Sequence, residues 1–237
     1  MNIFLAEYIG TLLLILIGQG VVCNVVLKDT KGNGGGLISI CFAWGIAVFV
    51  GVYTATKLGS GGHLNPAVTI AQLVLGNIDT NLAFWYIIAQ FAGAITGAIL
   101  AWLAYKQHFD VTSSSADKLG VFATGPSIRS YGYNVITEAI GTFVLVFGAL
   151  MISAPTATLG SLDALPVALL VLGIGLGLGG PTGWAINPAR DLGPRIAHFL
   201  LPISGKGSSD WSYSWVPVVG PIIGGVIAAI VFKTIQP

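Results

Sequence analysis

The chain has 237 residues, of which 54% are hydrophobic and 8% are charged, with a formal net charge of +1 and a mean hydropathy of +0.86. Soluble domains carry about 25% charged residues, so the composition excludes a water-soluble globular protein, and the small net charge gives no basic surface for nucleic acid. The two cysteines, Cys23 and Cys41, lie in apolar stretches, which argues against a disulfide or metal framework.

Six segments are apolar and long enough to cross about 30 Å of hydrocarbon. In chain order these predicted spans are residues 3–26, 37–57, 82–105, 133–153, 164–180 and 214–232. The first lacks the basic leading region of a cleavable signal peptide, so we expect it to remain as a span. Two further apolar stretches, residues 66–75 and 188–201, have about half that length, which is typical of re-entrant helices.

The two halves of the chain repeat one another. The segment AEYIGT at residues 6–11 opens the first span, and TEAIGT at residues 137–142 lies in the fourth. Two spans later, each half carries an Asn-Pro-Ala tripeptide: Asn65-Pro66-Ala67 and Asn187-Pro188-Ala189. With three spans in each half, the second copy enters from the opposite side of the membrane.

We therefore expect an all-α membrane protein with six transmembrane helices and two re-entrant half-helices in an inverted repeat. The whole chain, residues 1–237, forms one channel domain in this interpretation. The repeats cover approximately residues 1–115 and 130–237, and a polar loop near residues 107–130 joins them.

Each Asn-Pro-Ala motif is suited to start a helix at the centre of the membrane. Asparagine is a favoured N-cap, and proline at the first helical position misses no hydrogen bond. The positive ends of the two half-helices would meet near the midplane, where they repel cations and protons. The side-chain amides of Asn65 and Asn187 are then expected to donate hydrogen bonds into a lumen.

The backbone before each motif is rich in glycine and non-helical. Irregular backbone at membrane depth is tolerated where it lines a cavity or is buried in protein. Its carbonyl groups would form two rows of acceptors along a pore: Gly61, Gly62, His63 and Leu64, then Gly183, Trp184 and Ala185. Donors at the centre, acceptors along the wall and an apolar opposite face predict a path for small uncharged hydroxylated solutes.

On these motifs the chain resembles the major intrinsic protein family, the aquaporins and aquaglyceroporins, over essentially its whole length. GGHLNPAVT at residues 61–69 and NPARD at residues 187–191 are the most specific stretches. The resemblance implies the aquaporin fold, a homotetramer with a pore in each protomer, and cytoplasmic termini in a multi-pass protein of the cell membrane. The few basic residues in the loops favour the opposite orientation.

The resemblance also assigns the constriction of the pore to Trp44, Gly175, Trp184 and Arg190. Water-selective members are similar but carry a histidine where Gly175 stands. Two indoles with the guanidinium donors of Arg190 therefore indicate a glycerol-type filter, although glycerol channels usually have phenylalanine where Trp184 stands. Further positions that match the glycerol subgroup are Tyr105, Asp191, Arg195, Pro217 and Val218, with Val218 in place of the usual leucine.

Several polar and aromatic residues have a plain structural alternative. Glu7 and Glu138 are first-turn acids in one interpretation, whereas the resemblance implies that they brace the non-helical loops. Asp191 and Arg195, four residues apart, can form a local ion pair. The tryptophans near span ends suit interfacial anchors: Trp85, Trp102, Trp211 and Trp215.

The sequence thus predicts a passive channel for glycerol and similar small uncharged solutes, with some water, that excludes protons and ions and needs no cofactor. The preferred solute stays open among glycerol, water, urea, dihydroxyacetone and undissociated lactic acid. A coupled transporter would need a titratable acid in the path, and an enzyme would need a nucleophile–base pair or a metal cluster that the sequence does not suggest. A structural junction protein without flux is the remaining alternative.

Overall fold

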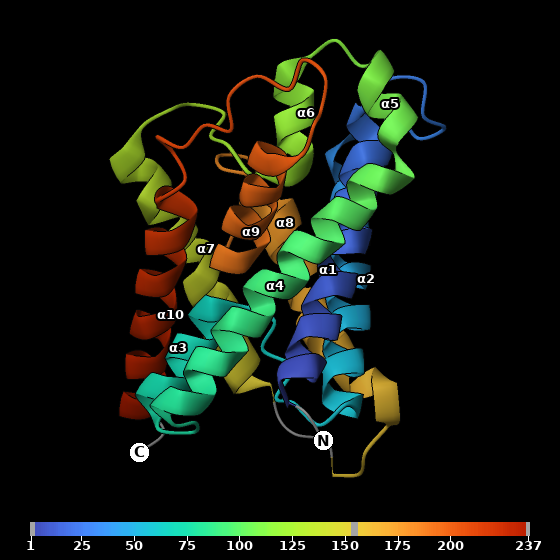
Figure 1. Ribbon diagram of the computed structural model, residues 1–237. Coiled ribbons are helices and arrows are strands. Elements are labelled where there is room, and N and C mark those ends of the chain that lie inside the picture. Colours follow the sequence, from blue (N-terminus) through green and yellow to red (C-terminus); the bar gives the residue numbers. More distant parts are fainter. Residues whose placement is uncertain (1–2, 153–155, 236–237) are drawn as a thin grey trace.

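The computed structural model describes residues 3–152 and 156–235, and all regular structure within these residues is helical. The elements are α1 (Ile3–Val26), α2 (Gly36–Lys57), α3 (Pro66–Leu75), α4 (Thr80–Ala104), α5 (Lys106–Val111), α6 (Ser115–Phe122), α7 (Tyr131–Met151), η1 (Gly160–Ala164), α8 (Leu165–Leu178), α9 (Pro188–Leu200) and α10 (Val216–Ile235). Figure 1 shows the long helices as a bundle, in which α1 begins and α10 ends at the same end.

The predicted spans are confirmed. Six helical segments of the described chain are long and apolar enough to cross a membrane: α1, α2, α4, α7, η1 with α8, and α10. α4 starts two residues before its predicted start because the Asp79 carboxylate caps it, accepting from the Leu82 N–H at 2.8 Å. The predicted end of the fourth span at residue 153 lies outside the described residues.

The two half-helices occupy the interior of the bundle. α3 and α9 start near its middle and run toward opposite ends (Figure 1). Asn65 and Asn187 cap them, and Pro66 and Pro188 take the first helical positions, as predicted. α3 is C-capped by Gly76 in the left-handed conformation, φ +81°, which glycine adopts without steric cost.

Close helix contacts hold each half together, and the pairing is repeated. α4 packs on α1, and α10 packs on α7. A Cβ at Gly97 of α4 would lie 2.6 Å from the Leu12 carbonyl oxygen, and one at Gly220 of α10 would lie 2.7 Å from the Glu138 Cβ. Both positions therefore require glycine for the helices to approach this closely.

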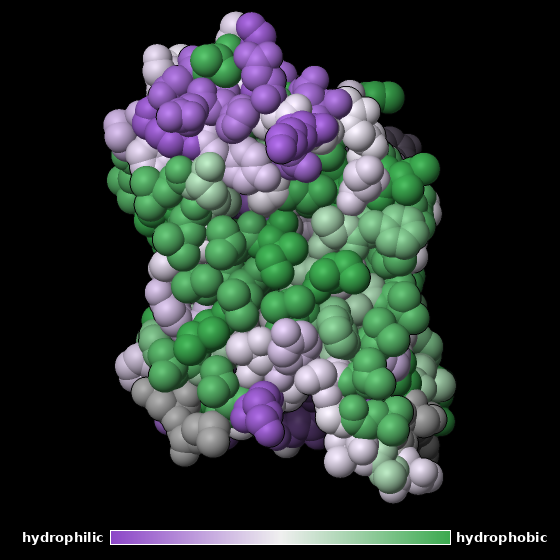
Figure 2. All heavy atoms as spheres, turned by 90° about the vertical axis from the view of Figure 1, so that its right-hand side faces the viewer, coloured by the Kyte–Doolittle hydropathy of each residue, from purple (hydrophilic) through white to green (hydrophobic). Residues whose placement is uncertain are grey.

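The outer surface is that of a multi-pass membrane protein. Figure 2 shows a hydrophobic band across the middle of the molecule with polar residues gathered mainly at one end. Trp85, Trp211 and Trp215 are 42–49% exposed, as interfacial anchors would be. Trp102 is only 8% exposed, so its predicted place at the interface is wrong: its ring packs into the core instead.

The connection between the halves is more ordered than the predicted polar loop. It contains α5 and α6, whose Phe109 and Phe122 are fully buried with ring centroids 5.7 Å apart. Lys118 of α6 is also buried and donates from Nζ to the Ser204 carbonyl oxygen at 2.5 Å. The serines and charged residues of this stretch predicted a loop, but Phe109 and Phe122 fix the stretch to the bundle.

Candidate functional site

A cavity of about 230 Å³ lies between the half-helices and the surrounding spans. Its apolar lining comes from the spans and the start of α3: Leu14, Val48, Val52, Val68, Leu145, Ala149, Val167 and Val171. Its polar lining comes from the non-helical segments before the two motifs, together with Asn65, Asn187 and Arg190. The cavity therefore offers a solute both apolar side chains and hydrogen-bonding groups.

The two motifs hold each other at the centre. Asn65 donates from Nδ2 to the Ile186 carbonyl oxygen, and Asn187 donates from Nδ2 to the Leu64 carbonyl oxygen, both at 2.8 Å. Each Oδ1 accepts from its own half-helix, from Ala67 N at 2.9 Å and from Ala189 N at 3.0 Å. One of the two N–H groups of each amide is thus used structurally, and the second is available to the cavity.

Glu7 and Glu138 hold the non-helical segments in equivalent ways. Glu7 accepts from the Ser60 hydroxyl at 2.7 Å, from His63 N at 3.0 Å and from Leu64 N at 2.8 Å. Glu138 accepts from the corresponding groups of the second half: the Thr182 hydroxyl at 2.6 Å, Ala185 N at 3.0 Å and Ile186 N at 2.8 Å.

These donors stand five, two and one residues before the motif asparagine in both halves. Glu7 also accepts from Gln90 Nε2 at 2.8 Å. Both carboxylates are at most 1% exposed, and neither is among the residues that line the cavity. The arrangement agrees with the predicted bracing role rather than with first-turn acids that face solvent.

The braced segments have unusual backbone angles. Leu64, Trp184 and Ile186 have positive φ, at +50°, +36° and +44°, which is uncommon for residues other than glycine. The glutamates bind the N–H groups of Leu64 and Ile186, so the surrounding hydrogen bonds maintain these angles. Such strain is concentrated at functional sites, where the backbone itself must face a ligand.

The predicted rows of acceptors are only partly in the lining. Gly61, Gly62, His63 and Leu64 line the cavity from the first half, and Trp184 and Ala185 from the second. Among the described residues the lining does not include Gly183, and it adds Ile186, which the sequence interpretation missed. His63 Nδ1 lies 3.2 Å from Thr69 Oγ1, and the His63 ring packs edge-on against Tyr86.

Trp44, Trp184 and Arg190 meet in the same cavity. The guanidinium carbon of Arg190 lies 4.1 Å from the centroid of the Trp44 ring, a cation–π contact. Arg190 is 8% exposed, and its guanidinium makes no hydrogen bond within the described part of the chain. Its donors are therefore free to bind a solute in the cavity.

Gly175 lies directly behind the Trp184 ring. It does not line the cavity formed by the described residues, and a Cβ there would lie 3.1 Å from Trp184 Cζ2 and 3.1 Å from Cys41 Sγ. Gly179 also lies against the Trp184 ring. The space left by these glycines is filled by the indole, so Gly175 acts on the cavity through the position of Trp184.

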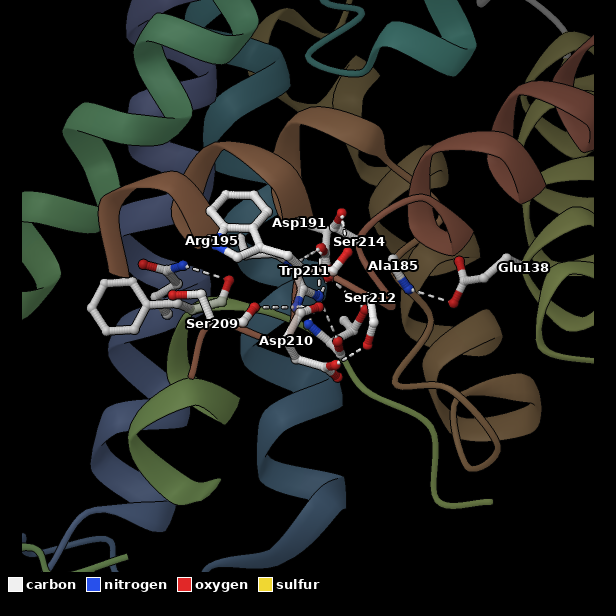
Figure 3. Close-up of polar contacts among 12 residues, drawn as sticks. Glu138, Ala185, Asp191, Arg195, Ser209, Asp210, Trp211, Ser212 and Ser214 are labelled. Atoms are coloured by element: carbon white, nitrogen blue, oxygen red, sulfur yellow. Dashed lines mark hydrogen bonds and ion pairs between the residues drawn. The ribbon is translucent and has the colours of Figure 1, made fainter. Parts of the chain in front are cut away.

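Asp191 and Arg195 form an ion pair of 2.8 Å with both side chains fully buried. Asp191 Oδ2 accepts from Thr124 N and Oγ1, both at 2.7 Å. Arg195 donates to the carbonyl oxygens of Thr124, Ser209 and Asp210 at 2.8–3.1 Å. Figure 3 shows this pair at the segment that carries Ser209 to Ser214, so it joins α9 to two loops in addition to the predicted local contact.

The other positions of the glycerol subgroup also lie outside the cavity lining of the described structure. Tyr105 caps the end of α4 and packs on the core, and Pro217 and Val218 lie in the first turn of α10. The sequence does not reveal the apolar lining residues, because valines that face a lumen recur at the same helical spacing as valines that pack in a helix interface.

Comparisons with known proteins agree with this geometry. A model of the major intrinsic protein family matches residues 1–232. A probable glycerol uptake facilitator protein of Thermotoga maritima is 53% identical over 233 residues, covering 98% of this chain and 99% of that protein.

The glycerol uptake facilitator protein of Bacillus subtilis is 51% identical over 233 residues, covering 98% of this chain and 84% of that protein. The solved structure of the aquaglyceroporin from Plasmodium falciparum has a TM-score of 0.86 at 32% identity, covering 99% of this chain and 96% of that one. The resemblance read from the motifs is confirmed, and the chain belongs to the major intrinsic protein family.

Proposed function

We propose that the protein is a passive transmembrane channel for glycerol and similar small uncharged solutes, which also passes some water and excludes protons and ions. One observation carries the proposal: apolar side chains, polar backbone and the motif asparagines line the same cavity, in which Arg190 meets two indoles. A polyol has this mixed character, with carbons on one side and hydroxyls on the other. The names of the similar proteins from Thermotoga maritima and Bacillus subtilis support the same solute.

The proposal extends to assembly and location. We place the protein in the plasma membrane as a homotetramer with cytoplasmic termini, acting as one domain of two inverted repeats without a cofactor and without enzymatic activity. A passive channel is favoured over a coupled transporter because Glu7 and Glu138 are occupied by loop donors. Proton coupling would require an acid that titrates in the solute path.

Flux in reconstituted vesicles tests the proposal. We expect proteoliposomes to swell in an inward glycerol gradient much faster than empty vesicles, with the same rate whether or not a proton or sodium gradient is present. The same preparation measures water, urea, dihydroxyacetone and lactic acid at low pH. A glycerol rate equal to that of empty vesicles would refute the proposal, and a gradient-dependent rate would favour a transporter.

The Trp44 indole gives a prediction about the width of the cavity. A Cβ at Gly18 of α1 would lie 2.5 Å from Cζ3 of this indole. Replacing Gly18 by alanine therefore forces the Trp44 ring toward the cavity and narrows it. We expect this to raise the barrier to glycerol passage by about 1 kcal/mol, which slows glycerol about fivefold. Because water is smaller, its rate should fall by less than twofold in stopped-flow light scattering.

Gly20 is the matched control for this substitution. It lies on the same helix, and a Cβ there would have no neighbour within 4 Å. Gly20→Ala should keep both rates within about 1.5-fold of the original, since the cost of such a helix-surface change is small. Equal glycerol rates in the two variants would show that Trp44 does not limit the width of the path.

A further inference from the structure

Gln72 is a lining residue of the cavity that none of the recognised pore motifs includes. It lies on α3, seven residues after Asn65. At a rise of 1.5 Å per residue, its backbone is about 10 Å from the motif along the helix axis. Figure 1 shows that α3 and α9 run toward opposite ends of the bundle. Gln72 lies in the last turn of α3 and Arg190 in the first turn of α9, so the two residues lie on opposite sides of the motif asparagines.

The end of α3 holds the Gln72 amide in one orientation. Beyond the left-handed Gly76, Asn77 N donates to the Gln72 carbonyl oxygen at 3.0 Å, and Asn77 Nδ2 donates to Gln72 Oε1 at 2.6 Å. In the described structure, Gln72 Nε2 has no hydrogen-bond partner. The acceptor of the amide is therefore occupied, and its two N–H donors remain available.

The neighbouring lining residues are apolar. Val68 lies one turn before Gln72 on α3, Ala149 lies near the end of α7, and Val167 lies near the start of α8. Donors beside such residues give this part of the cavity the same combination of polar and apolar groups as the Trp44 and Arg190 region. This combination suits a solute that carries hydroxyls along one edge and carbons along the other.

The two half-helices differ at this level. The residue seven positions after Asn187 is Pro194, which has no donor, and the residue three positions after Asn65, equivalent to Arg190, is Val68. Side-chain donors therefore stand close to the motif in the second half and two turns away from it in the first. Gln72 supplies at the α3 end of the cavity what Arg190 supplies at the other.

We propose that Gln72 forms a second hydroxyl-binding subsite, which takes small polyols at the α3 mouth through its Nε2 donors. The inference deepens the proposed function and rests on it. A polyol crossing the cavity meets donors from Arg190, then from the motif asparagines, then from Gln72. Solutes with fewer hydroxyls gain less from the last contact.

Gln72→Met tests the subsite, because methionine keeps the length of the side chain and removes the amide. In proteoliposomes we expect the glycerol rate to fall about fivefold, the loss of one neutral hydrogen bond, while the water rate changes by less than twofold. The ratio of the glycerol rate to the 1,2-propanediol rate should fall as well. Unchanged ratios in a folded variant would overturn the proposal.

Asn77→Ala separates binding from a structural role. This variant removes the hydrogen bond that orients the Gln72 amide but keeps the Nε2 donors, so its glycerol-to-water ratio should fall about twofold, less than in Gln72→Met. A fall as large as that of Gln72→Met would mean that the pair only stabilises the end of α3, and would refute the subsite. If the unaltered protein passes no glycerol, the proposed function itself fails; if it passes glycerol and Gln72→Met passes it equally well, only the subsite fails.

Discussion

Replacing Arg195 by methionine is expected to lower the free energy of unfolding by about 3–5 kcal/mol, because the change leaves a charge uncompensated in the interior. Asp191 and Arg195 are both fully buried, with 2.8 Å between Oδ1 and Nη2. The substitution also removes the donors to the Thr124, Ser209 and Asp210 carbonyl oxygens. The loss of stability is measured by thermal unfolding in detergent, with the monodisperse fraction in gel filtration as the measure of folded protein.

The chain contains a matched control for this pair. Lys106 and Asp110 have the same spacing of four residues and are 2.5 Å apart, but their side chains are 42% and 44% exposed. Lys106→Met should cost at most about 0.5 kcal/mol, because solvent screens an exposed pair.

The double variant Asp191→Leu/Arg195→Met should lose less than the two single variants added together, since it leaves no unpaired charge. Equal losses at Arg195 and Lys106 would show that the buried pair does not hold the loops against α9.

Much of the fold could be predicted because it depends on length and hydropathy. The hydrocarbon thickness requires about 20 apolar residues for a span, so the six spans and the two short helices were separable by length alone. The helix starts at Pro66 and Pro188 followed from capping chemistry, which is local. The equivalence of Glu7 and Glu138 could also be predicted, because the two Asn-Pro-Ala motifs allow the two halves of the sequence to be aligned.

Other features depend on tertiary contacts that a single sequence does not show. Trp102 looks like an interfacial residue by its place near a span end, yet it is buried because α4 carries it into the core. The role of Gly175 depends on the direction taken by the Trp184 ring. Gln72 has no motif of its own, and its amide is oriented by Asn77, beyond the end of the helix.

The motif asparagines show how local and tertiary signals combine. The sequence predicted two free amides, whereas each amide uses one N–H to bind the loop of the other half. The same Leu64 that accepts from Asn187 through its carbonyl group donates its N–H to Glu7. Each half of the centre is thus fixed by the other half and by its own glutamate, so the donors that remain have defined directions.

Arg190→Met is expected to lower the glycerol rate at least tenfold. Hydrogen bonds to a charged group contribute about 1.5–3 kcal/mol, which corresponds to about ten- to hundredfold in rate. Methionine keeps the apolar first part of the side chain and packs well against aromatic rings, so it removes the donors while part of the packing against Trp44 is retained. Swelling in a glycerol gradient, normalised to the amount of folded protein, measures the effect.

Arg129→Met serves as the control, because Arg129 is an exposed arginine paired with Asp210 at 2.6 Å and lies outside the cavity. Its glycerol rate per folded channel should stay within about twofold of the original, as expected for an exposed pair. If Arg190→Met conducts glycerol as well as Arg129→Met, the guanidinium of Arg190 is not a solute ligand.

Proton leakage in Arg190→Met separates the two electrostatic barriers of the channel. Arg190 contributes one charge in the cavity, whereas the N-termini of α3 and α9 meet at its centre and together contribute about one positive charge from their dipoles. Because the substitution leaves these termini unchanged, we expect a pH-sensitive dye inside the vesicles to report no added proton leak, even while glycerol slows tenfold. A leak that develops only in Arg190→Met would instead place the proton barrier at the guanidinium, and the opposed half-helices would then serve to position the asparagine donors.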